Sequence, residues 1–177
     1  SALLIDCRDL STQTIKIPEN VTVVVMDTGT RRELVGTGYA DRRLVCERAA
    51  DVLGVHSLRE ATLEDLEQLK TSDTQMIKRA QHVISENKRT ELAVAALRSN
   101  NPEELGRLMT ESHMSLQSDF EVSSPALDQI VQIALKSRGC FGARMTGGGF
   151  AGCAIALVES IAIDEFCHNV LESFTAP

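Results

Sequence analysis

The chain has 177 residues, which suits one domain of ordinary size or one large part of a bigger protein. It carries 18 Lys and Arg against 25 Asp and Glu, a net charge of −7, with one Tyr and no Trp. This composition excludes a general binder of nucleic acid, which needs surplus basic charge and aromatic platforms for the bases. Hydrophobic residues make up 43% of the chain, a share typical of globular proteins that excludes disorder for the bulk of it.

Targeting signals and disulfides are not predicted. The longest apolar runs, residues 21–26 and 152–158, are too short to cross a membrane. No basic segment followed by an apolar one opens the chain, so we expect no signal peptide. The five cysteines are odd in number and form no CxxC motif, which favours reduced thiols in a cytoplasmic protein.

Three strands are predicted near the start of the chain. Residues 2–7 are apolar, and residues 12–17 alternate in polarity with period two. The polar link between these segments favours a hairpin, and a turn follows at residues 18–20. Residues 21–26 are apolar and mostly β-branched, and they give the clearest strand prediction.

Helices are predicted from about residue 37 onward. Gly54 suits the end of the first helix, Thr62 can cap a short acidic helix, and Asp73 or Thr74 opens a longer one. Asn101 and Ser124 each precede a proline, which is a strong helix-start signal. The helical spacing of apolar residues indicates helices over about 37–53, 62–70, 74–97, 101–116, 124–135 and 163–174. With one further strand at residues 152–158, the element order indicates an α+β fold.

A glycine-rich segment spans residues 139–152. Residues 147–152 formally match GxGxxG, but a strand follows them rather than a helix, so we reject dinucleotide binding. Three consecutive glycines can present backbone N–H groups to an anion, with a positive φ expected at Gly148 if they do so. They can equally form a tight turn that lets a strand pack closely, and the pattern alone leaves both interpretations open.

Other polar candidates are less specific. Arg31 begins a locally basic stretch, residues 31–48, which suits either phosphate contacts or a salt-bridged helix face. Tyr39, the sole tyrosine, can donate to a polar ligand or cap the core. Asp119 and Glu121 flank Phe120 in what we expect to be a solvated loop. The four histidines are scattered, so we predict no metal site.

Residues 142–153, GARMTGGGFAGC, resemble the third motif of the GHMP kinases, the sugar and small-alcohol kinases that include homoserine, mevalonate and galactose kinases. Segments at residues 2–8, 32–47, 111–116 and 119–122 resemble segments of the galactokinase branch in the same order. The resemblance covers about residues 2–158. One position departs from the motif, because Ala151 stands where the family usually has glycine.

The resemblance implies a C-terminal portion, residues 1–177 as a single domain, with helices on one face of a mainly antiparallel sheet. The family's N-terminal sugar signature and phosphate loop have no counterpart here, and its catalytic aspartate is expected upstream of Ser1. The intact protein would use ATP and Mg²⁺ to phosphorylate galactose to galactose 1-phosphate, with the Mg²⁺ ligands outside this chain. The 177 residues alone would then be inactive.

Site residues carried over from the family lie in two segments. Tyr39 matches the tyrosine that contacts the sugar, and Arg31 aligns with a basic position near the phosphates. The third motif, Thr146, Gly147, Gly148 and Gly149, lies on the nucleotide side. The implied partners are galactose, ATP and the missing N-terminal half, with no nucleic acid and no membrane. Two alternatives stay open: a non-catalytic galactose and ATP sensor of the same ancestry, and a kinase for a related sugar such as N-acetylgalactosamine.

Overall fold

The computed structural model describes residues 1–30, 37–69 and 73–175 of the chain. It opens with the predicted hairpin, formed by β1 (Ala2–Ile5) and β2 (Thr12–Ile15). These strands are antiparallel, with Ala2 opposite Ile15 and Ile5 opposite Thr12, and they form a two-stranded sheet of their own. The sequence prediction of a hairpin is therefore confirmed.

A second sheet has three antiparallel strands in the order β3 (Val21–Asp27), β5 (Cys153–Glu159) and β4 (Cys140–Met145). The sequence predicted β3 and β5 but not β4, whose residues we read as part of the glycine-rich segment. Gly142 lies inside β4, next to an irregularity in the pairing with β5. A Cβ at Gly142 would collide with the main chain of Gly106 in α3 (Pro102–Ser118). Glycine at position 142 therefore allows the strand to pack closely against α3, and it does not form part of a loop.

The helices follow the predicted signals closely. They are α1 (Thr37–Leu53), α2 (Thr74–Arg98), α3, α4 (Pro125–Lys136) and α5 (Ile163–Ser173), with short 3₁₀ helices η1 (Glu64–Leu69) and η2 (Ser160–Ala162). The side chains of Asp73, Asn101 and Ser124 cap α2, α3 and α4 as expected. Gly54 has a φ of 67° directly after α1.

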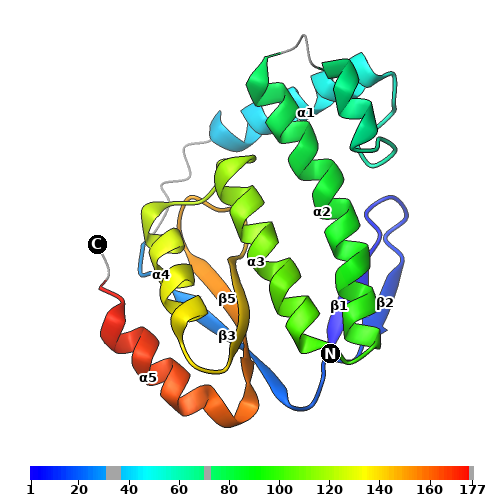
Figure 1. Ribbon diagram of the computed structural model, residues 1–177. Coiled ribbons are helices and arrows are strands. Elements are labelled where there is room, and N and C mark those ends of the chain that lie inside the picture. The colour runs from blue at the N-terminus through cyan, green and yellow to red at the C-terminus, as the bar shows by residue number, and fades with distance from the viewer. Residues whose placement is uncertain (31–36, 70–72, 176–177) are drawn as a thin grey trace.

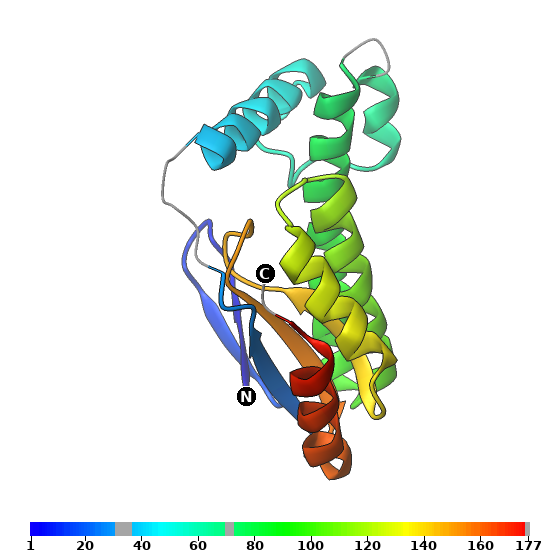
Figure 2. The ribbon, with the colours of Figure 1, turned by 90° about the vertical axis from the view of Figure 1, so that its left-hand side faces the viewer.

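Two hydrophobic clusters hold these elements together. The larger one lies between the three-stranded sheet and the helices α3, α4 and α5, and includes Leu127, Met145 and Phe166. The smaller one joins α1, η1 and the first half of α2. Figures 1 and 2 show α4 and α5 on one side of the sheet and the long α2 running from the smaller cluster to the hairpin. The predicted α+β fold, with helices on one face of an antiparallel sheet, is confirmed.

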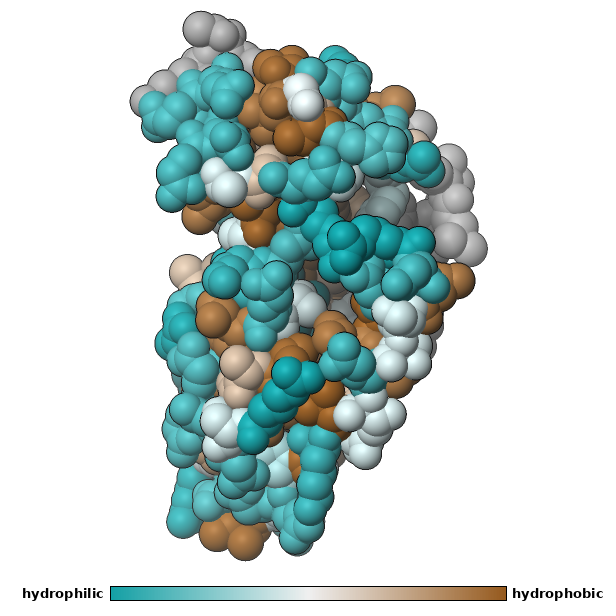
Figure 3. All heavy atoms as spheres, turned by 90° about the vertical axis from the view of Figure 1, so that its right-hand side faces the viewer, coloured by the Kyte–Doolittle hydropathy of each residue, from teal (hydrophilic) through white to brown (hydrophobic). Residues whose placement is uncertain are grey.

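Figure 3 shows one side of the molecule, where hydrophilic residues dominate and hydrophobic residues form separate clusters. Among the helices of the described residues, none is long and apolar enough to cross a membrane.

Candidate functional site

The glycine loop, residues 146–152, joins β4 to β5 and is fixed at both ends. The Thr146 N–H donates to the Cys153 carbonyl at 2.9 Å. Thr28, just after β3, donates to the Gly152 carbonyl from its backbone N at 3.0 Å and from Oγ1 at 2.7 Å. Hydrogen bonds therefore hold both ends of the loop where it leaves the sheet.

The loop reverses direction through left-handed residues on either side of its centre. Gly147 has a φ of 79°, Gly149 of 82° and Phe150 of 64°. Gly148 is not among the residues with positive φ, so the conformation that we expected there is wrong. The reversal is made by its two neighbours, which frees Gly148 from that constraint.

Both interpretations of the three glycines find support, at different residues. Gly149 is buried, and a Cβ there would collide with the carbonyl oxygen of Val122, so it serves close packing. Gly147 and Gly148 are exposed, and a Cβ on either would meet no atom within 4 Å. Among the described residues, no hydrogen bond uses their N–H groups. Exposed, unused N–H groups fit the approach of a phosphate.

Tyr39 lies in the first turn of α1, with 51% of its surface exposed. The rings of Tyr39 and Phe120 make an edge-to-face contact, in which the ring centroids are 6.4 Å apart and the ring planes are at 82°. Its neighbour Gly38 packs against the glycine loop, since a Cβ there would stand 3.3 Å from Cζ of Phe150. The fold thus brings Tyr39 and the glycine loop, about 110 positions apart in sequence, to one region. Arg31 lies outside the described residues.

The segment around Phe120 differs from the solvated loop that we expected. Glu121 is exposed, but both carboxylates have protein partners. Asp119 accepts a hydrogen bond from Ser115 at 2.8 Å, and Glu121 accepts one from the buried Arg79 at 2.5 Å. The Arg79 hydrogen bond, with the charges of nearby Lys78 and Arg42, lowers the pKa of Glu121.

Two histidines are buried in the same region. His82 stacks on Phe120 with ring centroids 4.4 Å apart, and its Nδ1 lies 2.9 Å from Oγ of Ser115. Burial lowers the pKa of His82 to about 4 and also lowers the pKa of His113. Both rings have protein partners, since Nδ1 of His113 accepts from the Met145 N–H at 3.3 Å. Within the described ranges, no group of three or more His, Cys, Asp or Glu side chains could hold a metal ion.

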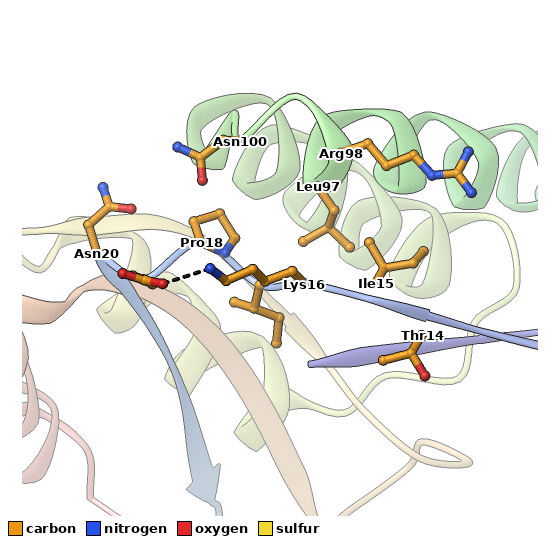
Figure 4. A pocket seen from close by; sticks show the side chains of 10 residues that line it. Thr14, Ile15, Lys16, Pro18, Asn20, Leu97, Arg98 and Asn100 are labelled. Atoms are coloured by element: carbon orange, nitrogen blue, oxygen red, sulfur yellow. Dashed lines mark hydrogen bonds and ion pairs between the residues drawn. The ribbon is translucent and has the colours of Figure 1, made fainter.

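Two open hollows lie away from these residues, beside the hairpin. One, of about 640 Å³, is bounded by β2, the turn after it and the C-terminal end of α2 (Figure 4). Of its charged side chains, Lys16 pairs with Glu19 at 2.6 Å, and Arg98 donates a hydrogen bond to Gln13 at 2.9 Å. The other, of about 660 Å³, lies between the hairpin and the middle of α2, where Arg59 pairs with Asp6. Neither hollow is lined by Tyr39 or the glycine loop.

Comparisons with known proteins agree on one class. Residues 93–175 match the family model described as GHMP kinases C terminal. A solved L. major mevalonate kinase in complex with R-mevalonate has a TM-score of 0.62 and 18% identity, covering 94% of this chain and 42% of that one, which shows a shared fold. Residues 93–175 are therefore similar to the C-terminal part of the GHMP kinases, and the fold of the chain is shared with a member of that family.

Galactokinases are among the proteins that match nearly the whole chain. The Bos taurus galactokinase is 43% identical over 175 residues, and the Chloroflexus aggregans galactokinase is 44% identical over 179 residues. Each alignment covers 98% of this chain and 45–46% of the relative. The solved Lactococcus lactis galactokinase complexed with galactose has a TM-score of 0.90 at 33% identity, covering 97% of this chain and 46% of that one. The chain therefore spans about half the length of these relatives.

Proposed function

We propose that this chain is the C-terminal part of a galactokinase, and that the whole protein transfers the γ-phosphoryl group of ATP to the anomeric hydroxyl of galactose. The structural observation that carries the proposal is the contact between the first turn of α1 and the glycine loop, made by Gly38 and Phe150. This contact supports the proposal, because Tyr39, which would contact the sugar, then lies near the loop that would face the nucleotide. The similarity to galactokinases over 98% of the chain supports the choice of substrate.

The roles of the residues follow from their exposure and chemistry. The exposed Tyr39 hydroxyl donates a hydrogen bond to galactose. Thr146 and the glycines 147–149 lie against the phosphates, and the N–H groups of Gly147 and Gly148 point to developing charge. Arg31 adds positive charge near the same phosphates. Phosphoryl transfer depends mostly on positioning and charge stabilisation, which are what these groups supply.

The remaining machinery belongs to the half of the protein outside these 177 residues. In this proposal that half carries the catalytic aspartate, the phosphate loop and the Mg²⁺ ligands, and it is the direct partner of residues 1–177 acting as a single domain. Bound Mg²⁺ neutralises charge on the ATP phosphates. A cytoplasmic location is supported by the five cysteines, all of which are free thiols in the structure.

The test is an assay of the full-length protein, meaning this chain joined to its N-terminal half, with ATP, Mg²⁺ and one sugar at a time. Galactose-dependent ADP release, with galactose 1-phosphate as the product, supports the proposal. Turnover only with N-acetylgalactosamine would identify that sugar, and not galactose, as the substrate. Binding of galactose and ATP without turnover would favour the sensor alternative.

A further inference from the structure

Residues 119–122, hereafter the 119–122 turn, follow α3 and contact both parts of the proposed site. The Phe120 ring meets the Tyr39 ring edge-on at 6.4 Å. Two residues later, the Val122 carbonyl accepts a hydrogen bond from the N–H of Phe150 in the glycine loop at 2.5 Å. One short segment therefore contacts the proposed sugar side and the proposed nucleotide side at once.

Helix α1 is bonded to the same turn. Arg42 donates from Nε to the Phe120 carbonyl at 2.9 Å and from Nη2 to the Glu121 carbonyl at 2.7 Å. Its Nη1 donates to the Gly38 carbonyl at 2.7 Å, and its guanidinium carbon lies 5.2 Å from the Phe150 ring centroid. The N-terminal turn of α1, which carries Tyr39, thus has a fixed relation to the 119–122 turn.

The conformation of the 119–122 turn needs support from outside itself. Glu121 has a φ of 51°, a left-handed conformation that residues other than glycine adopt only when their surroundings hold them. The support comes from Arg79 of α2, which is only 1% exposed. Arg79 donates to the Asp119 carbonyl and to the Glu121 carboxylate, and its guanidinium carbon lies 5.9 Å from the Phe120 ring centroid.

A buried guanidinium is retained only where its donors have partners. Among the described residues, the hydrogen-bond and ring partners of Arg79 all lie in one turn, so its position and the conformation of the turn determine each other. Removing Arg79 leaves Glu121 free to abandon the left-handed conformation. Phe120 and Val122 on either side would then shift, and with them the contacts to Tyr39 and Phe150.

We propose that Arg79 is a positioning residue, which fixes the 119–122 turn and thereby sets Tyr39 relative to the glycine loop. This inference rests on the proposed function, in which these two elements hold galactose and ATP. A displacement of about 1 Å between reacting groups costs on the order of 100-fold in rate. Arg79 touches neither substrate and acts only through the turn.

The kinetic test compares Arg79→Met with Arg89→Met in the full-length protein. Arg89 is the control, because it is another arginine of α2, with 18% of its side chain exposed, but it pairs with Glu86 and Ser85 and not with the 119–122 turn. We expect Arg79→Met to lower kcat and to lower kcat/KM for galactose and for ATP by similar factors of at least tenfold. Arg89→Met is expected to keep both KM values within about twofold. Normal kinetics in folded Arg79→Met would overturn the inference.

A second measurement does not depend on activity. Hydrogen–deuterium exchange at the Phe150 amide reports its bond to Val122. We expect at least tenfold faster exchange at this amide in Arg79→Met than in Arg89→Met, and an unchanged rate would refute the positioning role. If the wild-type protein phosphorylates no galactose, the proposed function is refuted. The exchange measurement still tests the effect of Arg79 on the glycine loop, because it does not need activity.

Phe120→Leu covers the case in which Arg79→Met does not fold. It keeps an apolar side chain between His82 and Tyr39 but removes the ring contacts. We expect a several-fold rise in KM for galactose with a smaller change in KM for ATP. Equal KM values in wild type and Phe120→Leu would contradict the link between the 119–122 turn and Tyr39.

Discussion

Gly149 packs so closely against Val122 that a Cβ at position 149 would overlap the Val122 carbonyl oxygen. The same oxygen accepts the hydrogen bond from Phe150, so one carbonyl fixes two consecutive residues of the glycine loop. The φ of 82° at Gly149 adds a second constraint, because side chains strain the left-handed region. Gly148, its neighbour, has neither constraint. This contrast makes two substitutions, one residue apart, informative in different ways.

Gly149→Ala should destabilise the full-length protein. The left-handed conformation costs a residue with a Cβ about 1–2 kcal/mol, and overpacking adds about 1–3 kcal/mol. We expect a clear fall in the urea midpoint and in Tm. An unchanged Tm would show that the loop relaxes away from Val122 at no cost, and would contradict the packing role.

Gly148→Ala should leave stability within about 0.5 kcal/mol of wild type, because its Cβ enters open space. The same Cβ would stand where the phosphates approach, so we expect kcat/KM for ATP to fall several-fold while Tm stays constant. Ala151→Gly, which restores the residue usual in the family, is expected to keep full activity. Normal ATP kinetics in Gly148→Ala would remove the phosphate role from this part of the loop.

Local signals in the sequence predicted most elements but not the relations among them. The caps at Asn101 and Ser124 depend on neighbouring residues alone, and both were predictable. Strand β4 was not, because Gly142 disfavours a strand locally and is tolerated only through its contacts with β5 and Gly106. The contact between Gly142 and Gly106 of α3 joins residues far apart in sequence, so a local pattern does not reveal it.

The site shows the same limit. The glycine loop and Tyr39 carry recognisable patterns, whereas Arg79 does not. Arg79 lies 40 residues from Asp119 in sequence, and the helical periodicity of α2 does not indicate which groups a buried arginine contacts. The one available signal was an arginine beside an apolar stripe, directly before Ala80, at a position that helical periodicity places near the core. The preferred φ at Gly148 was wrong for a related reason, since three glycines leave several ways to reverse the chain.

Tyr39→Phe should weaken the use of galactose with little effect on ATP. The substitution removes only the hydroxyl and keeps the ring contact with Phe120, so the fold should not change. A hydrogen bond to a neutral sugar hydroxyl is worth about 0.5–1.5 kcal/mol, which corresponds to a two- to twelve-fold fall in kcat/KM for galactose. Steady-state kinetics with each substrate varied in turn measure both effects. If kcat/KM for galactose is unchanged, Tyr39 only packs against Phe120.

The 177-residue chain by itself should not phosphorylate galactose. In the proposed function the catalytic aspartate, the phosphate loop and the Mg²⁺ ligands lie outside it. Loss of one preorganised electrostatic group costs about 100- to 1,000-fold in rate, and several are missing here. A coupled ADP-release assay with galactose checks this, with the full-length protein as the positive control. Comparable turnover by the two proteins would refute the assignment of the catalytic groups to the other half.

The stability of the fold should fall on mild acidification because of His82. Burial is the main cause that lowers its pKa from 6.5 to about 4, so the folded protein keeps the ring neutral at pH 5. The unfolded chain takes up a proton as the pH falls below about 6.5. Acidification therefore favours the unfolded state between pH 6.5 and pH 4, whereas stability above pH 7 is independent of this group.

The expected loss from His82 between pH 7 and pH 5 is about 2 kcal/mol in the free energy of unfolding. Urea unfolding of the full-length protein at both pH values measures it, and His82→Gln is the matched variant, since glutamine can still bond Ser115 but does not titrate. His113 has a pKa shifted in the same direction and is present in both proteins, so the difference between them isolates His82. We expect the variant to lose about 2 kcal/mol less than wild type on acidification. Equal losses would mean that His82 takes up its proton in the folded protein, which the burial of the ring argues against.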